Sequence, residues 1–191
     1  MRLLLFGGSF NPVHIGHLVM AQEVRAQFGY DLVLFIPSLH PPHKTFAEDP
    51  GAEHRLAMLR GAVDGDSCLG VEDCEIRRGG TSYTIDTVRD IASRYPVDGK
   101  PGLIVGDDLI PGFAAWKEPG IIARETDIIC ARRTSPGRLE LSFPHRYADN
   151  PLVAVSSSLI RERARSGRPF RHFLPRSVYE YILREGLYGL R

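Results

Sequence analysis

The first seventeen residues carry a strand, a glycine turn and the start of a helix in immediate succession. The apolar run from Leu3 to Phe6 has the length of a strand and stops at Gly7-Gly8. Apolar residues then recur at helical spacing, at Leu18, Met20, Ala21 and Val24. Glycine lets a ligand approach the backbone closely, and the N–H groups at a helix start attract anions. This succession predicts a site for a phosphate between a buried strand and the helix that follows it.

Two histidines, His14 and His17, lie on one face of that helix's first turn if the helix has begun by His14. Imidazoles there can donate hydrogen bonds to phosphoryl oxygens and stabilise the charge that grows in phosphoryl or nucleotidyl transfer. Taken alone, such a pair is more often two surface histidines, and a metal pair is another alternative, although neither HExxH nor a Cys/His cluster supports it. The Walker A and GxGxxG patterns are absent, which argues against a dehydrogenase domain. The glycines before the pair and the helix after it favour the catalytic interpretation.

Length and composition predict one domain over residues 1–191, with a C-terminal helical portion from about residue 157. A net charge of +1 argues against a protein that neutralises many nucleic-acid phosphates. The N-terminal apolar run is too short for a signal peptide or a membrane span, and the three cysteines lack metal-binding or disulfide-scaffold spacing. We therefore expect a cytoplasmic protein that binds neither nucleic acid nor membrane. The sequence is compatible with a homo-oligomer and leaves the oligomeric state open.

Buried strands and amphipathic helices alternate along the chain. Beyond residues 3–6, strands are expected at 31–37, 102–105, 126–131 and 152–155. Helices are expected from the histidine pair to about residue 28, at 52–63, from about 84, at 119–123, after 156 and over 174–188. Short extended segments are expected at residues 68–76 and a turn at 77–80. Residues 135–150 are expected to form an irregular polar stretch. In the last helix, Val178, Ile182 and Leu183 are expected to face inward, with Gly186 as the C-cap. The alternation predicts a Rossmann-like open parallel sheet with helices on both faces.

Polar residues follow two of these strands. Gly106-Asp107 ends the strand at 102–105, where an acidic side chain could bond to ribose hydroxyls or cap the next helix. Ser156, Ser157 and Ser158 begin a helix whose first turns carry Arg161, which makes an anion cradle. Both sets lie at the carboxyl ends of strands, where open α/β sheets bind their ligands.

Three further candidates come from a loop, a helix start and a single aromatic residue. Lys44 lies in the loop at 38–51 and could reach a phosphate or simply be solvated. The hydroxyls of Ser82 and Thr84 suit a helix cap, and equally a carboxylate ligand. Trp116 is the only tryptophan, and its ring could stack on a pyridine or belong to the core.

The segment from Gly7 to His17 resembles the GGxFxPxHxGH signature of the HxGH nucleotidyltransferase superfamily. Its members join a nucleoside triphosphate to a phosphorylated acceptor and release pyrophosphate. The resemblance implies catalytic roles for His14 and His17. It also implies ATP contacts by Gly7, Gly8, Ser9, Phe10 and His17.

Four later segments resemble bacterial nicotinate-mononucleotide adenylyltransferases, so the resemblance runs from Arg2 to Tyr188. PPHK places a catalytic, acceptor-binding lysine at Lys44, and SYTIDT implies that Thr84 binds the nicotinate carboxylate, supported by Ser82 and Tyr83. The GxDxLxxxxxW pattern implies that Gly106 and Asp107 contact the nucleotide and that Trp116 lies near the acceptor's base. VSSSLIR is similar to ISSTxIR, a motif of the whole superfamily, with Val155 and Ser158 in place of Ile and Thr. It implies ATP phosphate contacts by Ser156, Ser157, Ser158 and Arg161, and a catalytic role for Arg161.

The resemblance implies transfer of AMP from ATP to nicotinate mononucleotide, giving deamido-NAD and pyrophosphate, with Mg²⁺ bridging the phosphates. The sequence shows no dedicated metal site. The same chemistry on nicotinamide mononucleotide or phosphopantetheine is the nearest alternative, and SYTIDT with Trp116 argues against phosphopantetheine. A nucleotide sensor without turnover is the alternative from another class. It is disfavoured because His14, His17, Lys44 and Arg161 are all present.

Overall fold

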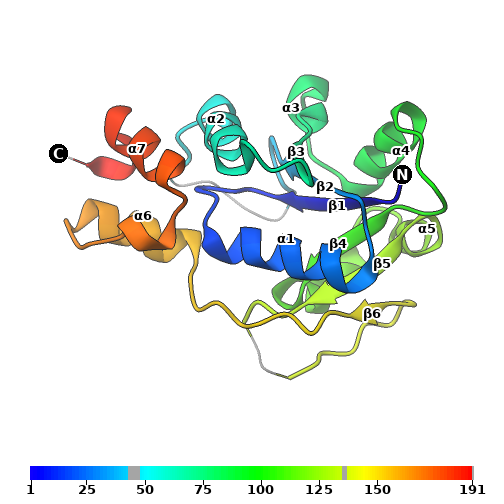
Figure 1. The fold of residues 1–191 in the computed structure, drawn as a ribbon. Helices are drawn as coiled ribbons and strands as arrows, with labels where there is room; N and C mark the ends of the chain where they lie inside the picture. The colour runs from blue at the N-terminus through cyan, green and yellow to red at the C-terminus, as the bar shows by residue number, and fades with distance from the viewer. Residues whose placement is uncertain (43–47, 135–136, 191) are drawn as a thin grey trace.

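The computed structural model describes residues 1–42, 48–134 and 137–190, and its strands form one twisted parallel sheet (Figure 1). The order of the strands is β3-β2-β1-β4-β5-β6, and each pair of neighbours is parallel. The strands are β1 Leu3–Gly8, β2 Leu32–Pro37, β3 Leu69–Val71, β4 Gly102–Gly106, β5 Asp127–Ala131 and β6 Arg146–Tyr147. This architecture confirms the predicted Rossmann-like sheet with helices on both faces.

Helices connect the strands and extend the chain beyond the last of them. The α-helices are α1 Ile15–Phe28, α2 Ala52–Val63, α3 Cys74–Arg78, α4 Thr84–Arg94, α5 Pro119–Glu125, α6 Ser157–Arg165 and α7 Arg176–Arg184. Shorter 3₁₀ segments are η1 Asp107–Ala115, η2 Arg171–Phe173 and η3 Leu187–Gly189. Helix α1 ends as predicted at Gly29, whose φ of 68° is in the left-handed region that glycine tolerates best.

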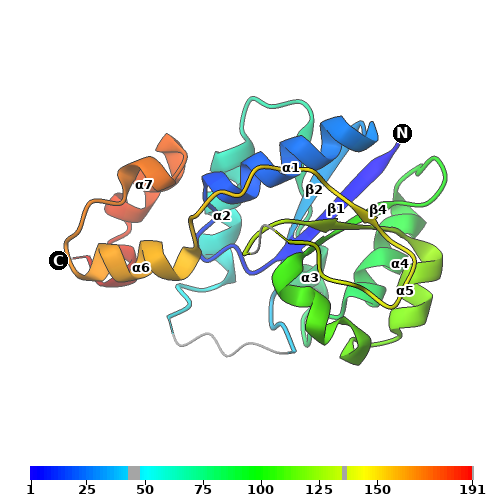
Figure 2. The same ribbon diagram turned by 90° about the horizontal axis from the view of Figure 1, so that it is seen from below.

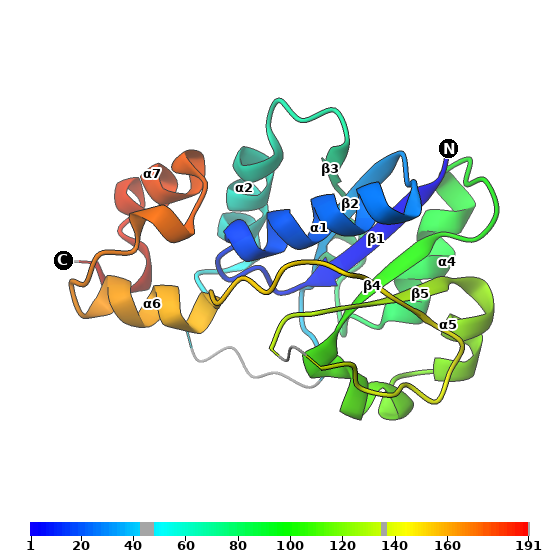
Figure 3. The ribbon, with the colours of Figure 1, turned by 60° about the horizontal axis from the view of Figure 1, so that its bottom comes forward.

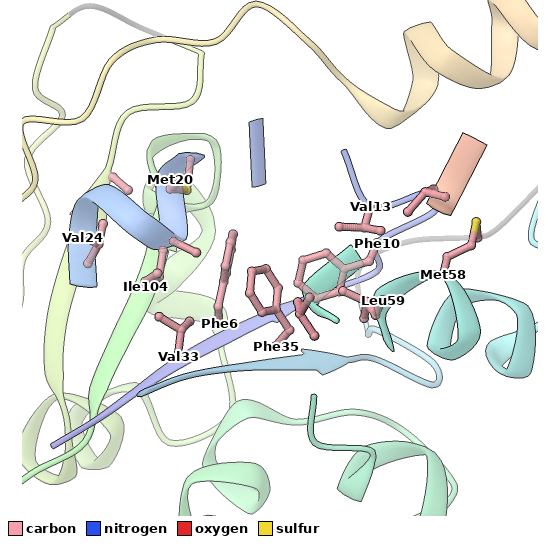
Figure 4. Close-up of a cluster of buried hydrophobic side chains, with 14 of the residues drawn as sticks. Phe6, Phe10, Val13, Met20, Val24, Val33, Phe35, Met58, Leu59 and Ile104 are labelled. Atoms are coloured by element: carbon pink, nitrogen blue, oxygen red, sulfur yellow. The ribbon is translucent and has the colours of Figure 1, made fainter. Parts of the chain in front are cut away.

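The sheet separates two apolar cores, because successive residues of a strand point to opposite faces. Leu4 and Phe6 of β1 pack with residues of α1, α2, α6 and α7 on one face. Leu3 and Leu5 pack with residues of α3, α4 and α5 on the other. All four side chains are buried, which is why the strand is apolar at every position instead of every second one. Figure 4 shows the first core, with the rings of Phe6 and Phe35 beside each other.

A crevice opens where the order of the strands reverses, between β1 and β4. β1 pairs with β2 along its whole length, from Leu3 to Gly8, but it pairs with β4 only at Leu4 and Leu5. The carboxyl halves of β1 and β4 therefore separate. Ligands of open α/β sheets bind at this kind of topological switch point.

The C-terminal helices lie beside the carboxyl end of β1, on the side of α2 (Figure 2). Side chains join them to earlier segments: the Ser177 hydroxyl donates to the Gly61 carbonyl at 2.7 Å, and the Tyr188 hydroxyl donates to Asn11 Oδ1 at 2.8 Å. The end of the chain thus supports the loop between β1 and α1.

Three local predictions were wrong. Residues 152–155 form no strand, because Leu152 is exposed and the Val155 amide bonds to the Val153 carbonyl at 2.7 Å instead of to a neighbouring strand. The edge strand β6 comes from the stretch predicted to be irregular, and it has no apolar run because it pairs with β5 over two residues only. Cys74–Arg78 is a helix, not an extended segment and a turn.

The last helix is also shorter than predicted. α7 ends at Arg184, and Leu183 is 49% exposed because it follows the buried Ile182 and is turned about 100° away from it. Gly186 has the expected left-handed φ of 60°, one residue beyond the cap position at Glu185.

Substitution of Gly102 by alanine is expected to lower the free energy of unfolding by about 1–3 kcal/mol, because the new methyl overpacks the core. A Cβ at Gly102 would lie 2.5 Å from the ring of Tyr30 and 2.8 Å from Leu4 Cδ1. Gly112→Ala is the matched control, since a Cβ there would meet no atom within 4 Å. Urea unfolding of both variants measures the difference. Equal stability of the two variants would contradict this account of the β1–β4 contact.

Candidate functional site

A cavity of about 500 Å³ occupies the crevice at the carboxyl ends of β1 and β4. It brings together three sequence-predicted groups that are far apart along the chain. They are Gly7 and Gly8 at the end of β1, with Ser9 after them; Ser82, Tyr83 and Thr84 at the start of α4; and Trp116 after η1. The lining is largely apolar apart from these groups, and Leu5, Ile36, Val88 and Ile122 contribute to it. The cavity therefore combines a largely apolar lining with a few polar groups from several elements.

The first turn of α4 contributes polar groups to the lining of the cavity. Tyr83 is the N-cap residue and Thr84 the first residue of the helix, so the helix N-terminus and the Thr84 hydroxyl both adjoin the cavity. The Ser82 hydroxyl accepts a hydrogen bond from the Leu39 amide at 2.9 Å. This bond joins the start of α4 to the loop after β2. A helix N-terminus in this position suits an anionic group.

Trp116 is a further lining residue of the cavity. Its ring packs on Phe113, with 4.7 Å between centroids and 35° between planes, and the residue is partly exposed to the cavity. Its neighbour Lys117 also lines the cavity, and its ammonium lies 4.8 Å from the centre of the Tyr83 ring and 3.0 Å from the Asp86 carboxylate. A flat aromatic ring and a cation thus stand on one side of the cavity.

Sequence reasoning missed Lys117, Glu75 and Thr87 as lining residues. Glu75 is buried and accepts a 2.6 Å hydrogen bond from the Thr87 hydroxyl, and burial is the main cause that raises the pKa of its carboxyl. The position of Lys117 directly after Trp116 could have identified it. No local pattern points to Glu75, because its contact with Thr87 depends on how α3 and α4 pack.

The two histidines lie together at the start of α1. Their rings stack with 3.7 Å between centroids, and the His14 amide donates to His17 Nδ1 at 3.2 Å. Because Nδ1 of His17 accepts this bond, the Nε2 of a neutral His17 carries the proton and can donate it. His14 is the N-cap residue of α1 and both of its ring nitrogens are buried without a hydrogen-bond partner among the described residues. The pair is thus buried beside the loop before α1, and neither histidine lines the cavity.

Helix α6 begins beside the start of α1, as Figure 3 shows. The Ser157 hydroxyl donates to the Pro12 carbonyl at 2.9 Å, and Arg161 donates to the Asn11 carbonyl at 2.8 Å. Ser156 is the N-cap residue and accepts from the Leu159 amide at 3.2 Å, while Ser158 is exposed. The predicted serine and arginine cradle thus adjoins the histidine loop.

Phe10 and Asp107 are both buried, so their side chains serve the fold. Phe10 is 1% exposed and packs its ring edge-on against His17, with 5.1 Å between centroids. Asp107 is fully buried and accepts hydrogen bonds of 3.0 Å from the amide and the hydroxyl of Thr134. Gly106 precedes it at the end of β4, and Asp108 pairs with Arg133 at 3.1 Å. The two acidic side chains after β4 thus join it to the segment after β5.

Lys44 lies outside the described residues. Within 1–42, 48–134 and 137–190, no group of three or more His, Cys, Asp or Glu side chains could hold a metal ion. A search of the same residues finds no helix with the length and apolarity needed to cross a bilayer.

His14 is expected to make the protein sensitive to acid. Burial, and secondarily the charge of Arg133, lowers the pKa of His14 from 6.5 to about 3. Between these two values the unfolded chain binds a proton that the folded chain does not, so the free energy of unfolding falls as the pH falls, by at most about 1.4 kcal/mol per pH unit. His14→Gln should remove this dependence, measured by urea unfolding from pH 7 to pH 4. Parallel profiles for the variant and the wild type would contradict the shift.

Comparison with known proteins agrees with this geometry. A family model described as cytidylyltransferase-like matches residues 5–163. A protein of Borrelia garinii subsp. bavariensis named probable nicotinate-nucleotide adenylyltransferase is 40% identical over 188 residues, which cover 98% of this chain and 95% of that protein. A protein of the same name from Salinibacter ruber is 41% identical over 194 residues, which cover 98% of each chain.

A solved structure shares the fold at low sequence identity. Plasmodium falciparum nicotinic acid mononucleotide adenylyltransferase, complexed with NaAD, superposes with a TM-score of 0.80 at 16% identity and covers 100% of this chain and 98% of that one. The family model spans most of the chain, and the two bacterial relatives are similar over nearly its whole length. The chain therefore belongs to the cytidylyltransferase-like family and, within it, to the nicotinate-nucleotide adenylyltransferases.

Proposed function

We propose that the protein transfers AMP from ATP to nicotinate mononucleotide, giving nicotinate adenine dinucleotide and pyrophosphate. The observation that carries the proposal is the cavity that joins the glycine end of β1 to the N-terminus of α4 and to Trp116. A phosphate suits the first of these, a carboxylate the second and a flat ring the third. Nicotinate mononucleotide carries all three groups.

The reaction needs alignment and charge stabilisation more than a covalent nucleophile. A phosphate oxygen of the acceptor attacks the α-phosphorus of ATP and forms a new P–O bond, while the bond to the leaving pyrophosphate breaks. His17 would donate from Nε2 to the oxygens on which charge grows, and His14, kept neutral by burial, would donate to the triphosphate.

ATP would lie across the end of β1, at Gly7 and Gly8, and the start of α6. Gly7, Gly8, Ser9 and Phe10 would offer backbone groups, Gly106 and Asp107 would border the nucleotide, and Ser156, Ser157, Ser158 and Arg161 would hold its phosphates. Lys44 would add a charge on the acceptor's side. Mg²⁺ would enter as part of the substrate, held mainly by phosphate oxygens and water, which fits a described chain without a resident cluster of metal ligands.

The acceptor would lie in the cavity, with its pyridine ring against Trp116 and its carboxylate at the first turn of α4. Thr84 would donate its hydroxyl to the carboxylate, with Ser82 and Tyr83 holding the turn, and Lys117 would add positive charge nearby. N–H donors, a hydroxyl and a cation favour a carboxylate over a carboxamide. We therefore propose a preference for nicotinate mononucleotide over nicotinamide mononucleotide.

Pyrophosphate release tests the proposal. The purified protein is incubated with ATP and Mg²⁺ and either nicotinate mononucleotide or nicotinamide mononucleotide. A strong preference for the acid is the expected result. Comparable rates would leave the transfer chemistry intact but overturn the assignment of the carboxylate to Thr84. No release with either acceptor, together with tight ATP binding, would favour a nucleotide sensor.

A further inference from the structure

Arg55, in the first turns of α2, is a charged side chain with no exposed surface. A guanidinium in the interior must be satisfied by hydrogen bonds and an opposite charge, because burial of an unpaired ion is very costly. Its Nε donates to the Asp49 carboxylate at 3.0 Å. Its Nη1 donates to the carbonyls of Ser9 and Ser38 at 3.0 and 2.7 Å. One planar group thus holds three segments of chain together.

Two of these segments are walls of the cavity. Ser9 follows β1 and Ser38 follows β2, and both line the cavity, whereas Arg55 itself does not. The two segments also bond to each other, since the Ser38 amide donates to the Gly8 carbonyl at 2.9 Å. Arg55 therefore sets the spacing of two adjacent walls from behind, without touching the space that a ligand would occupy.

The bond from Arg55 to the Ser9 carbonyl also orients the peptide between Ser9 and Phe10. Phe10, the next residue, has a φ of 46°, a left-handed conformation that is rare for a residue with a side chain. The Ser9 carbonyl and the Phe10 N–H belong to one planar trans peptide and point in opposite directions. By fixing the carbonyl, Arg55 fixes the direction in which this N–H points.

We propose that Arg55 is a positioning residue for the acceptor site, setting the distance between the walls at Ser9 and Ser38 and thereby the affinity for the acceptor mononucleotide. The inference rests on the proposed function and names the part of the site that the residue serves. A lysine would keep the charge, but its ammonium lacks the planar fork that reaches three acceptors on different segments at once. Charge alone is therefore insufficient, and the geometry of the guanidinium is required.

Direct binding of nicotinate mononucleotide, measured by calorimetry, tests the inference with the substitution Arg55→Lys. The expected result is a loss of acceptor affinity of about 10- to 100-fold, because a displaced wall misplaces the ligand. ATP would also contact the backbone at Ser9 and Phe10, so its affinity should fall as well, but by less than about 3-fold, because the serines and Arg161 at the start of α6 would hold its phosphates. Arg60→Lys is the matched control, because Arg60 lies on the same helix in an exposed pair with Asp73 and should leave both affinities unchanged.

Asp49→Ala gives a second variant that does not place a new group in the interior. It removes the carboxylate partner of Arg55 and leaves the two carbonyl bonds, so a smaller loss of acceptor affinity is expected. If Arg55→Lys folds, an unchanged acceptor affinity overturns the inference, and so do equal losses of affinity for the acceptor and for ATP. If Arg55→Lys does not fold, an unchanged acceptor affinity in Asp49→Ala overturns it. A wild-type protein that does not bind nicotinate mononucleotide would instead refute the proposed function.

Discussion

Replacement of His17 by alanine is expected to lower kcat by about 10²- to 10³-fold, the usual cost of removing one donor that stabilises developing charge. The affinity for ATP should change little in comparison. The reason is that Nδ1 of His17 accepts the His14 amide at 3.2 Å, so the neutral ring carries its proton on Nε2, which would donate toward charge that appears only in the transition state. Steady-state rates with the acid acceptor, together with ATP binding measured by calorimetry, separate the two effects.

The control for this prediction is His54→Ala. His54 is also a helical histidine, but it bonds to the Tyr181 hydroxyl of α7 at 3.0 Å and not to the loop before α1. Its loss should leave kcat within about 2-fold, as for most substitutions away from a site. Equal losses of turnover and ATP affinity in His17→Ala would refute the role given to His17, because they would indicate uniform binding of the ground state and the transition state.

The sequence predicts the parts of this molecule that depend on local pattern. The run from Leu3 to Phe6 and the αL residue Gly29 behave as expected, because each conformation is set by neighbouring residues. The turn predicted at Gly7-Gly8 was wrong, because both glycines continue β1 in register with Ile36 and Pro37 of β2. The edge strand β6 was missed because two paired residues leave no period to detect. Leu152 was assigned to a strand on apolar character alone, without an available partner strand.

In the cavity too, residues that belong to a local motif could be predicted, and residues placed by packing could not. Its motif residues, such as Thr84 and Trp116, could be found in the sequence, and the structure brings them together as the parallel sheet requires. Glu75, Lys117 and Arg55 could not be assigned in this way. In the sequence, Arg55 is one of several polar residues of an amphipathic helix. It becomes a buried cation only because α2 packs against the ends of β1 and β2.

Substitution of Arg161 by methionine is expected to raise the KM for ATP by about 10- to 100-fold, which corresponds to the loss of charge-assisted hydrogen bonds to phosphate. Methionine keeps most of the apolar stem, so the packing of α6 should survive. Arg165→Met is the matched control, because Arg165 lies one turn further along α6 and is more exposed, at 55% against 20%. Initial rates over a range of ATP concentrations measure both variants. Equal rises in KM would show a diffuse effect of charge and contradict a specific contact by Arg161.

The carboxylate of Glu48 pairs with Arg161 in the free protein and is therefore expected to affect the KM for ATP as well. It accepts from Nε of Arg161 at 3.1 Å and also pairs with Arg165, and these bonds lower the pKa of the Glu48 carboxyl. A guanidinium that holds a carboxylate in the free protein can hold a phosphate instead, so the triphosphate and Glu48 should compete for Arg161. Glu48→Gln should therefore lower the KM for ATP by about 2- to 5-fold, the worth of an exposed ion pair. A KM that rises in Glu48→Gln would mean that Glu48 orients Arg161 for ATP instead of competing with it.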